Sequence, residues 1–276
     1  MSYDLRGCCD LHVHTGPDIV PRKLGGMEMA RQASAAGMRG FAVKSHVGST
    51  AGRVSILREL FPELQIFSGI TLNRQVGGIN PAAVEAAAKM GAKLLWFPTM
   101  DAKLYRKEAG APDWESGLSA LNGSGRVSEE ALAVLHMAKK YNMVVGTGHL
   151  GGEEGQKLVE AGHEIGVRHM VLTHVTLPVC QMDVEQLRCC VSLGAVLEYS
   201  YCHILSGKCT AEYTARQIQA VGTEHVILST DLGQVNNPYP VEGLAAFCGL
   251  LLEHGISEEE LDQMTKRNPC GLLLDT

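Results

Sequence analysis

The stretch LVEAGHEIGVRHMVLTH, residues 158–174, contains one copy of the helix–glycine–strand pattern that decides the fold. A helical segment ends at Ile165, and Gly166 follows, where the left-handed turn after a helix favours glycine. A short apolar run then ends in polar residues, as a buried strand does when it reaches the edge of a sheet. The same order recurs around four other glycines, Gly37, Gly91, Gly194 and Gly222.

Along the chain this pattern gives eight strands and eight helices. We expect strands at 8–13, 40–45, 65–71, 93–98, 143–147, 169–173, 195–199 and 225–230. We expect helices at 27–36, 51–60, 81–90, 128–141, 153–165, 183–193, 211–221 and 241–254. Short, nearly all-apolar strands alternating with helices are typical of a parallel sheet covered by helices. The sequence therefore predicts an α/β fold, a (β/α)₈ TIM barrel in a single domain over residues 1–276.

Two details of the pattern refine this prediction. An open, doubly wound sheet is the structural alternative, but no glycine-rich phosphate turn follows the first strand. The longest interruption, residues 99–126, follows the fourth strand. We expect it to form a loop over the mouth of the barrel, where barrel enzymes build their substrate sites.

The composition excludes several classes of function. A net charge of −6, a pI near 6.0 and only 5% aromatic residues argue against a nucleic-acid-binding surface. No apolar run is long enough for a transmembrane helix, and the N-terminal segment lacks the apolar region of a secretory signal. Nine cysteines, an odd number with adjacent pairs, do not suggest a disulfide framework. We expect a cytoplasmic protein without membrane or nucleic-acid partners.

Polar residues gather where the predicted strands end. Five of the eleven histidines follow apolar runs directly: His12, His14, His46, His149 and His174. Asp231 ends the eighth strand in ILSTDLG. In a barrel these ends meet at the catalytic face. The other six histidines are expected at the surface or half-buried: His136, His163, His169, His203, His225 and His254.

These side chains have the chemistry of a metal site. His12 and His14 stand two residues apart on one strand, so both rings point the same way. Histidines with a carboxylate suit one or two divalent ions, zinc first and manganese or iron as alternatives. Such an ion lowers the pKa of a bound water, and Asp231 would take its proton. The alternative for Asp231 is an N-cap of the following helix.

The chain here resembles the amidohydrolase superfamily. The resemblance rests on His12-x-His14, His149, His174 and Asp231 in this order on strands one, five, six and eight, and on the closing segment MTKRNPCGLLLD. It implies that His12, His14 and Asp231 bind one metal ion. It further implies that His149 and His174 serve a second metal or the substrate, with His174 and Asp231 as catalytic residues.

The sequence departs from the superfamily at the bridging ligand. Binuclear members carry a carboxylated lysine or a glutamate at the end of strand four, where this chain has Thr99 and Asp101. Lys44 ends the second strand in FAVKSH instead. It could be a carboxylated metal bridge, an anchor for a substrate carboxylate, or a partner of Glu198, because a buried ammonium needs a partner. Glu198, within the seventh strand, likewise needs one.

We expect a metal-dependent hydrolase in which activated water attacks an amide, lactone or ester-like bond of a small molecule. His46, Arg74 and Glu198 are assigned to substrate binding, with a solvated loop arginine as the plainer reading of Arg74. DLHVHT also resembles the polymerase-and-histidinol-phosphatase (PHP) phosphoesterases, although TDLGQ lacks their D-x-H ending. A metal-binding barrel with a decarboxylase or other non-hydrolytic role, such as a non-enzymatic binding protein, is the other alternative. Assembly into a homo-oligomer stays open.

Overall fold

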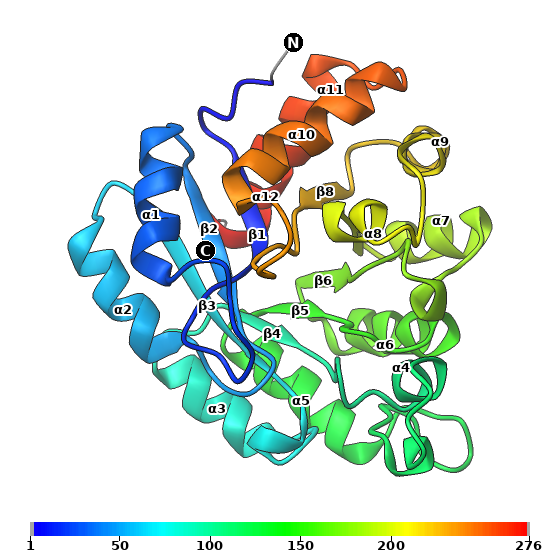
Figure 1. The fold of residues 1–276 in the computed structure, drawn as a ribbon. Helices are drawn as coiled ribbons and strands as arrows, with labels where there is room; N and C mark the ends of the chain where they lie inside the picture. Colours follow the sequence, from blue (N-terminus) through cyan, green and yellow to red (C-terminus); the bar gives the residue numbers. More distant parts are fainter. Residues whose placement is uncertain (1–2, 275–276) are drawn as a thin grey trace. The chain divides into compact units, whose positions relative to one another are not determined.

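The computed structural model describes residues 3–274, in which eight strands alternate with helices (Figure 1). The strands are β1 (Cys9–His14), β2 (Gly40–Lys44), β3 (Gln65–Thr71), β4 (Leu94–Trp96), β5 (Val144–Gly146), β6 (His169–Leu172), β7 (Val196–Ser200) and β8 (Val226–Ser229). The helices that correspond to the predicted ones are α1 (Gly26–Ala35), α2 (Ala51–Leu60), α3 (Pro81–Lys89), α5 (Glu129–Lys140), α6 (Gly152–Ile165), α7 (Val184–Ser192), α9 (Ala211–Val221) and α10 (Pro240–Glu253).

Local sequence explains where these helices begin and end. All five glycines predicted to follow helices have a positive φ, between 67° and 88°. Several helix starts carry side-chain caps: the Asn80 side chain accepts from two backbone N–H groups of α3, which has Pro81 as its first residue. Asp183 and Gln186 form a capping box at the start of α7. The helix–strand boundaries are therefore set by residues visible in the sequence.

The strand order confirms the (β/α)₈ prediction. The strands are paired in sequence order, β1 to β8, and each registered pair is parallel. The first and last strands also meet, because Val13 pairs with Leu232 in parallel orientation and the His14 N–H donates to the Leu232 carbonyl at 2.8 Å. A sheet whose first strand contacts its last has the topology of a TIM barrel.

The described chain divides into two compact units. Unit 1 comprises residues 3–45, 50–68 and 198–274, with β1, β2, β8 and the adjoining parts of β3 and β7. Unit 2 comprises residues 46–49 and 69–197, with β4, β5, β6 and the remaining parts of β3 and β7. In unit 1, α12 (Asn268–Leu274) lies beside β1 and β8 (Figure 1). That residues 1–276 act as a single domain stays a prediction.

Several short elements lie outside the predicted pattern. The segment 99–126, predicted as a loop, contains α4 (Lys103–Glu108) and the one-turn helix η2 (Trp114–Ser116). Two more such turns are η1 (Arg74–Val76) and η3 (Pro178–Cys180). The helix α8 (Tyr201–Leu205) follows β7 directly, and α11 (Glu258–Asp262) and η4 (Gln263–Arg267) lead into α12.

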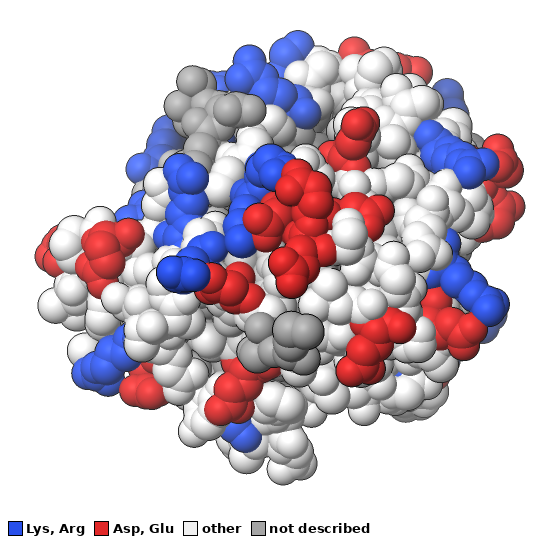
Figure 2. All heavy atoms as spheres, turned by 90° about the horizontal axis from the view of Figure 1, so that it is seen from above, with Lys and Arg blue, Asp and Glu red and all other residues white. Residues whose placement is uncertain are grey.

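On the face shown in Figure 2, acidic and basic side chains are intermingled. Among residues 3–274, none of the helices combines the length and the apolar character that crossing a membrane requires.

Candidate metal centre and histidine cluster

The first strand carries three polar side chains, and all three are buried. Asp10, His12 and His14 are each no more than 1% exposed. The pairing with β2 shifts register between Asp10 and Val13, so regular alternation does not extend to Asp10. His12 and His14, two residues apart, point the same way, while the intervening Val13 packs in the core. The sequence pattern thus produces the convergence it predicted.

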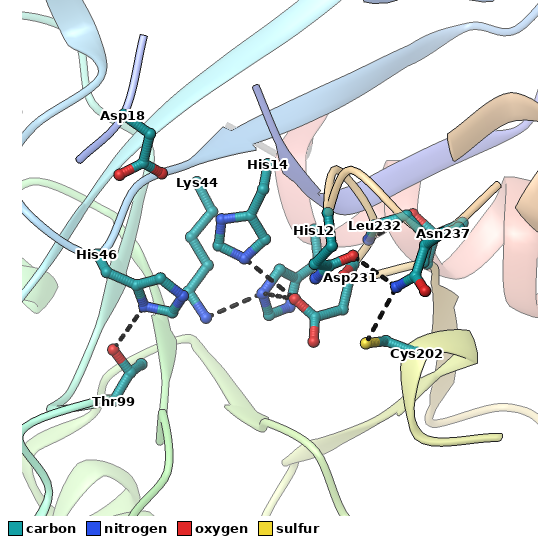
Figure 3. A network of polar contacts seen from close by, with 12 residues as sticks. His12, His14, Asp18, Lys44, His46, Thr99, Cys202, Asp231, Leu232 and Asn237 are labelled. Atoms are coloured by element: carbon teal, nitrogen blue, oxygen red, sulfur yellow. Dashed lines mark hydrogen bonds and ion pairs between the residues drawn. The ribbon is translucent and has the colours of Figure 1, made fainter. Parts of the chain in front are cut away.

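Three ligand atoms meet at one point in unit 1. The Nε2 atoms of His12 and His14 lie 3.2 Å and 3.0 Å from the same oxygen, Oδ1 of Asp231 (Figure 3). A tetrahedral zinc ion with bonds of about 2.0–2.1 Å separates its ligand atoms by about 3.3–3.4 Å. Burial lowers the pKa of His14 to about 4, so its ring is neutral near pH 7, the form that binds metal.

The partners of His12 strengthen the case for a cation here. Glu198 is 2% exposed, and its Oε1 lies 2.9 Å from His12 Nδ1. A carboxylate accepts, so Nδ1 carries the proton and Nε2 presents a lone pair. That lone pair faces Oδ1 of Asp231, which is also an acceptor. Because two acceptor atoms 3.2 Å apart repel each other, a positive charge is needed beside them. The Lys44 Nζ atom, 2.9 Å from Nε2, supplies a donor, and a divalent ion held by the two rings and Asp231 would satisfy all three ligand atoms.

Asp10 holds the backbone around this point. Its Oδ1 accepts from the backbone N–H groups of His12 and Thr230, both at 3.1 Å, and its Oδ2 accepts from the Thr230 hydroxyl. These residues include one proposed ligand, His12, and the neighbour of another, Asp231. Burial raises the pKa of Asp10 to about 7. Asp10 thus ties β1 to the end of β8.

Asp231 is held in an uncommon backbone conformation. Its φ is 53°, in the left-handed region that residues other than glycine rarely adopt. Its N–H donates to the His12 carbonyl at 2.9 Å, and its own carbonyl accepts from Gln234 at 2.8 Å. The alternative role of a helix N-cap does not apply, because α10 begins only at Pro240. Such strain costs of order 1–3 kcal/mol and is typical of functional positions.

His203 departs from the expectation. It was predicted at the surface or half-buried, but it lies in α8 and is only 4% exposed. One of its ring nitrogens lies within 4.8 Å of an Asp231 oxygen. Burial lowers the pKa of His203 to about 4. The other five histidines outside the strand ends are half-buried or exposed, as expected.

A second polar cluster lies in unit 2 and contains the other predicted histidines. The ring centroid of His149 lies 5.1 Å from that of His174, 6.1 Å from that of His46 and 4.5 Å from that of Tyr105. His174 has a φ of 62°, so it shares with Asp231 the left-handed conformation. That His149 and His174 are metal ligands stays a prediction from the resemblance.

The remaining predicted residues have specific partners. Arg74, whose side chain is 42% exposed, donates to the carbonyl and the hydroxyl of Ser116 at 2.8 and 2.7 Å. It thereby connects η1 to η2. Its assignment to substrate binding stays a prediction. Glu198 was assigned to the substrate or to Lys44, but the partner found for its carboxylate among residues 3–274 is His12.

Sequence comparison places the chain in a family without a known function. Residues 7–198, more than half of the chain, match the family described as "Family of unknown function (DUF6282)". The chain belongs to the DUF6282 family. No curated protein matches it in sequence.

Solved structures show which fold this DUF6282 protein shares. An amidohydrolase from Pseudomonas aeruginosa has a TM-score of 0.67 at 12% identity, covering 97% of this chain and 95% of its own. A mutant organophosphorus hydrolase from Deinococcus radiodurans has a TM-score of 0.58 at 15% identity, covering 99% and 95%. A Xaa-Pro dipeptidase with bound methionine has a TM-score of 0.61 at 16% identity, covering 97% and 75%. The amidohydrolase-type TIM barrel predicted from the motifs is confirmed as the fold.

Proposed function

We propose that this DUF6282 protein is a metal-dependent hydrolase that cleaves an amide, lactone or ester-like bond of a small molecule. The observation that supports this most directly is the meeting of His12 Nε2, His14 Nε2 and Asp231 Oδ1 in a buried site. When bound there, a divalent ion would supply a water of lowered pKa and polarise the scissile bond.

The chain's own residues then have distinct tasks. Glu198 accepts the Nδ1 proton of His12 and so keeps Nε2 available as a ligand. Asp231 would help to hold the ion through Oδ1, and its carboxylate would accept a proton as general base, since its side chain is 16% exposed and so still reachable. Asp10 fixes the backbone that presents both ligands. Glu198 is therefore proposed as a positioning residue rather than a substrate contact.

For the histidine cluster of unit 2 we keep the assignments from the sequence. His149 and His174 are proposed to serve a second ion or the substrate, and His174 to take part in catalysis. His46 and Arg74 are proposed to contact the substrate. The support is that the rings of His46, His149 and His174 gather within one cluster, as expected for strand ends that meet.

Lys44 is proposed as a carboxylated metal ligand. Its side chain is fully buried, and Nζ lies 2.9 Å from the proposed ligand atom His12 Nε2. An ammonium so close to a divalent ion would be repelled, whereas a carboxylated lysine carries a negative charge and attracts it. The same argument disfavours Lys44 as a cationic anchor for a substrate carboxylate.

Metal content tests the proposal first. Purified protein should contain zinc, manganese or iron by elemental analysis, and His14→Ala should lose it. His254→Ala, which alters an exposed histidine at the end of α10, should keep it. Equal metal content in His14→Ala and wild type would contradict the site.

A substrate panel then tests the reaction. We expect turnover of a lactone, an ester or an N-acyl amide, lost with a chelator and restored by added metal. A phosphotriester and a phosphomonoester represent the phosphoesterase alternative, and a carboxylated substrate that releases CO₂ represents the decarboxylase. If only the phosphoesters or only the carboxylated substrate were turned over, the proposed cleavage of an amide, lactone or ester-like bond would be wrong.

The role of Lys44 has a separate test. With bicarbonate present, a carboxylated bridge predicts two ions per chain in wild type and fewer in Lys44→Ala. Lys93→Ala is the control, since Lys93 donates to the Asn142 carbonyl in unit 2. One ion in both wild type and Lys44→Ala would exclude the bridge.

The proposed setting is the cytoplasm. All nine cysteines are free thiols, which supports a reducing compartment. A small-molecule substrate is the proposed partner.

A further inference from the structure

Two buried side chains in unit 2, Asn73 and Thr99, form a hydrogen-bond chain that ends on the half-buried His46. The Nδ1 atom of His46 lies 2.8 Å from the hydroxyl oxygen of Thr99 (Figure 3). The same oxygen lies 2.7 Å from the side-chain nitrogen of Asn73. Thr99 is fully buried and Asn73 is 1% exposed, so water does not compete for these bonds.

Backbone groups determine which way the Asn73 amide points. Its Oδ1 accepts from the backbone N–H groups of Thr99 at 2.9 Å and Asp101 at 3.3 Å. Backbone N–H groups are donors only, so the atom facing them must be the oxygen. The Nδ2 group therefore donates on the other side, to the Thr99 hydroxyl and to the His46 carbonyl at 2.9 Å.

The Thr99 hydroxyl can donate one hydrogen bond, and the acceptor of that bond determines which ring nitrogen of His46 is protonated. Among residues 3–274 this hydroxyl has two partners, Asn73 Nδ2 and His46 Nδ1. Nδ2 already donates to it, so its own proton finds an acceptor at Nδ1. If Nδ1 were protonated instead, the buried hydroxyl proton of Thr99 would have no acceptor among the described residues, and an unsatisfied buried donor is costly.

We infer that Asn73 and Thr99 hold His46 as the tautomer protonated on Nε2. In this state Nε2 donates a hydrogen bond and offers no lone pair to a metal ion. His46 is then a donor to an oxygen of the ligand, a carbonyl or carboxylate oxygen, and not a metal ligand. The substrate role rests on the proposed function, whereas the tautomer follows from the hydrogen bonds alone.

The tautomer can be measured without knowing the substrate. Nitrogen-15 NMR separates protonated from unprotonated ring nitrogens, and His46→Gln assigns the His46 signals by their loss. At pH 8, where a histidine of ordinary pKa, about 6.5, is neutral, we expect wild-type His46 protonated on Nε2. It should stay so when zinc is added. A wild-type Nδ1–H signal, or a zinc-induced loss of the Nε2 proton, would overturn the inference.

Variants test the cause. Thr99→Val removes the hydroxyl at nearly constant volume, and we expect both tautomers to be populated. Thr99→Ser should restore the single tautomer. Thr71→Val is the matched control: Thr71 is a buried threonine of the same unit whose hydroxyl has no hydrogen-bond partner among the described residues. A folded Thr99→Val protein with an unchanged single tautomer would refute the role of Thr99.

Reversing the direction of the hydrogen bonds from Asn73 through Thr99 to His46 gives the sharpest test. Asn73→Asp replaces the donor with an acceptor, which takes the Thr99 proton and leaves the hydroxyl oxygen to accept from His46. We therefore expect His46 to switch to the Nδ1–H form. A folded Asn73→Asp protein that keeps the Nε2–H form would contradict the inference. Absence of bound metal in wild type would refute the proposed function while leaving this measurement valid, so the two failures are distinguishable.

Discussion

Replacing Glu198 by glutamine tests how the centre holds its metal. Glu198 contacts His12 Nδ1 at 2.9 Å and is not one of the three converging residues, His12, His14 and Asp231. Glutamine keeps an oxygen that can accept the same hydrogen bond but removes the negative charge. The variant therefore isolates the electrostatic effect of Glu198 on His12 from its steric effect.

The structure sets the expected size of the effect. A carboxylate behind a metal-binding histidine makes the ring a better ligand, and losing such a partner weakens metal binding about 10- to 100-fold. This corresponds to about 1.4–2.7 kcal/mol. The stability of the metal-free protein should change little, because Oε2 of Glu198 is buried without a hydrogen-bond partner among the described residues. In the glutamine variant, an amide group without a full set of hydrogen bonds takes the place of a carboxylate in the same condition, so the cost of burial changes little.

Two measurements check this prediction. Competition with a chromophoric chelator gives the zinc Kd, and urea unfolding of the metal-free protein gives its stability. Glu154→Gln is the matched control, since Glu154 is also buried but accepts from Ser119 and Ala120 in unit 2. An unchanged zinc Kd in Glu198→Gln would refute the reasoning, and a higher KM at unchanged Kd would restore the substrate-binding role first assigned to Glu198.

Three further predictions follow from other contacts. Asp10→Ala leaves two buried backbone N–H groups without their acceptor and should lower the free energy of unfolding by about 2–6 kcal/mol, which urea unfolding would show. Asp231→Asn should lower kcat on any substrate found by about 10²- to 10⁴-fold while circular dichroism stays unchanged. Burial raises the pKa of Cys190 to about 12, so at pH 8 its thiolate is scarce. Iodoacetamide followed by peptide mass spectrometry should label the exposed Cys189 and leave Cys190 unmodified.

The fold could be predicted because each step of the chain carries its own boundary signal. Gly166 and Gly222 end helices that occupy the predicted segments to within a residue or two at either end. The helix α8 was missed because YCHIL follows β7 directly, with no glycine or proline between them. Five residues are also too few to show a helical period. His203 was misjudged for the same reason, since its burial depends on where α8 packs.

The candidate site could be predicted in its residues and only partly in its contacts. A rule that polar residues at strand ends face the site selected His12, His14 and Asp231, and the structure brings them together. The same rule applied to strands three and four would have selected Asn73 and Thr99, which are uncharged. Which partner each buried charge takes could not be predicted. Sequence gives no reason for Glu198 to pair with His12 rather than with Lys44.

The junction of β1 with the end of β8 explains why the proposed metal ligands of unit 1 can meet at all. His12 and His14 belong to β1 and Asp231 follows the end of β8, so the ligand set exists only when β1 and the segment after β8 pair. The pairing bonds run through the ligands themselves, from Asp231 N–H to the His12 carbonyl and from His14 N–H to the Leu232 carbonyl. They hold Asp231 in its left-handed conformation, whose cost the rest of the fold must offset. Assembly of this proposed metal centre is thus coupled to the pairing of β1 with the segment after β8, and a bound ion would stabilise the folded chain by binding to it alone.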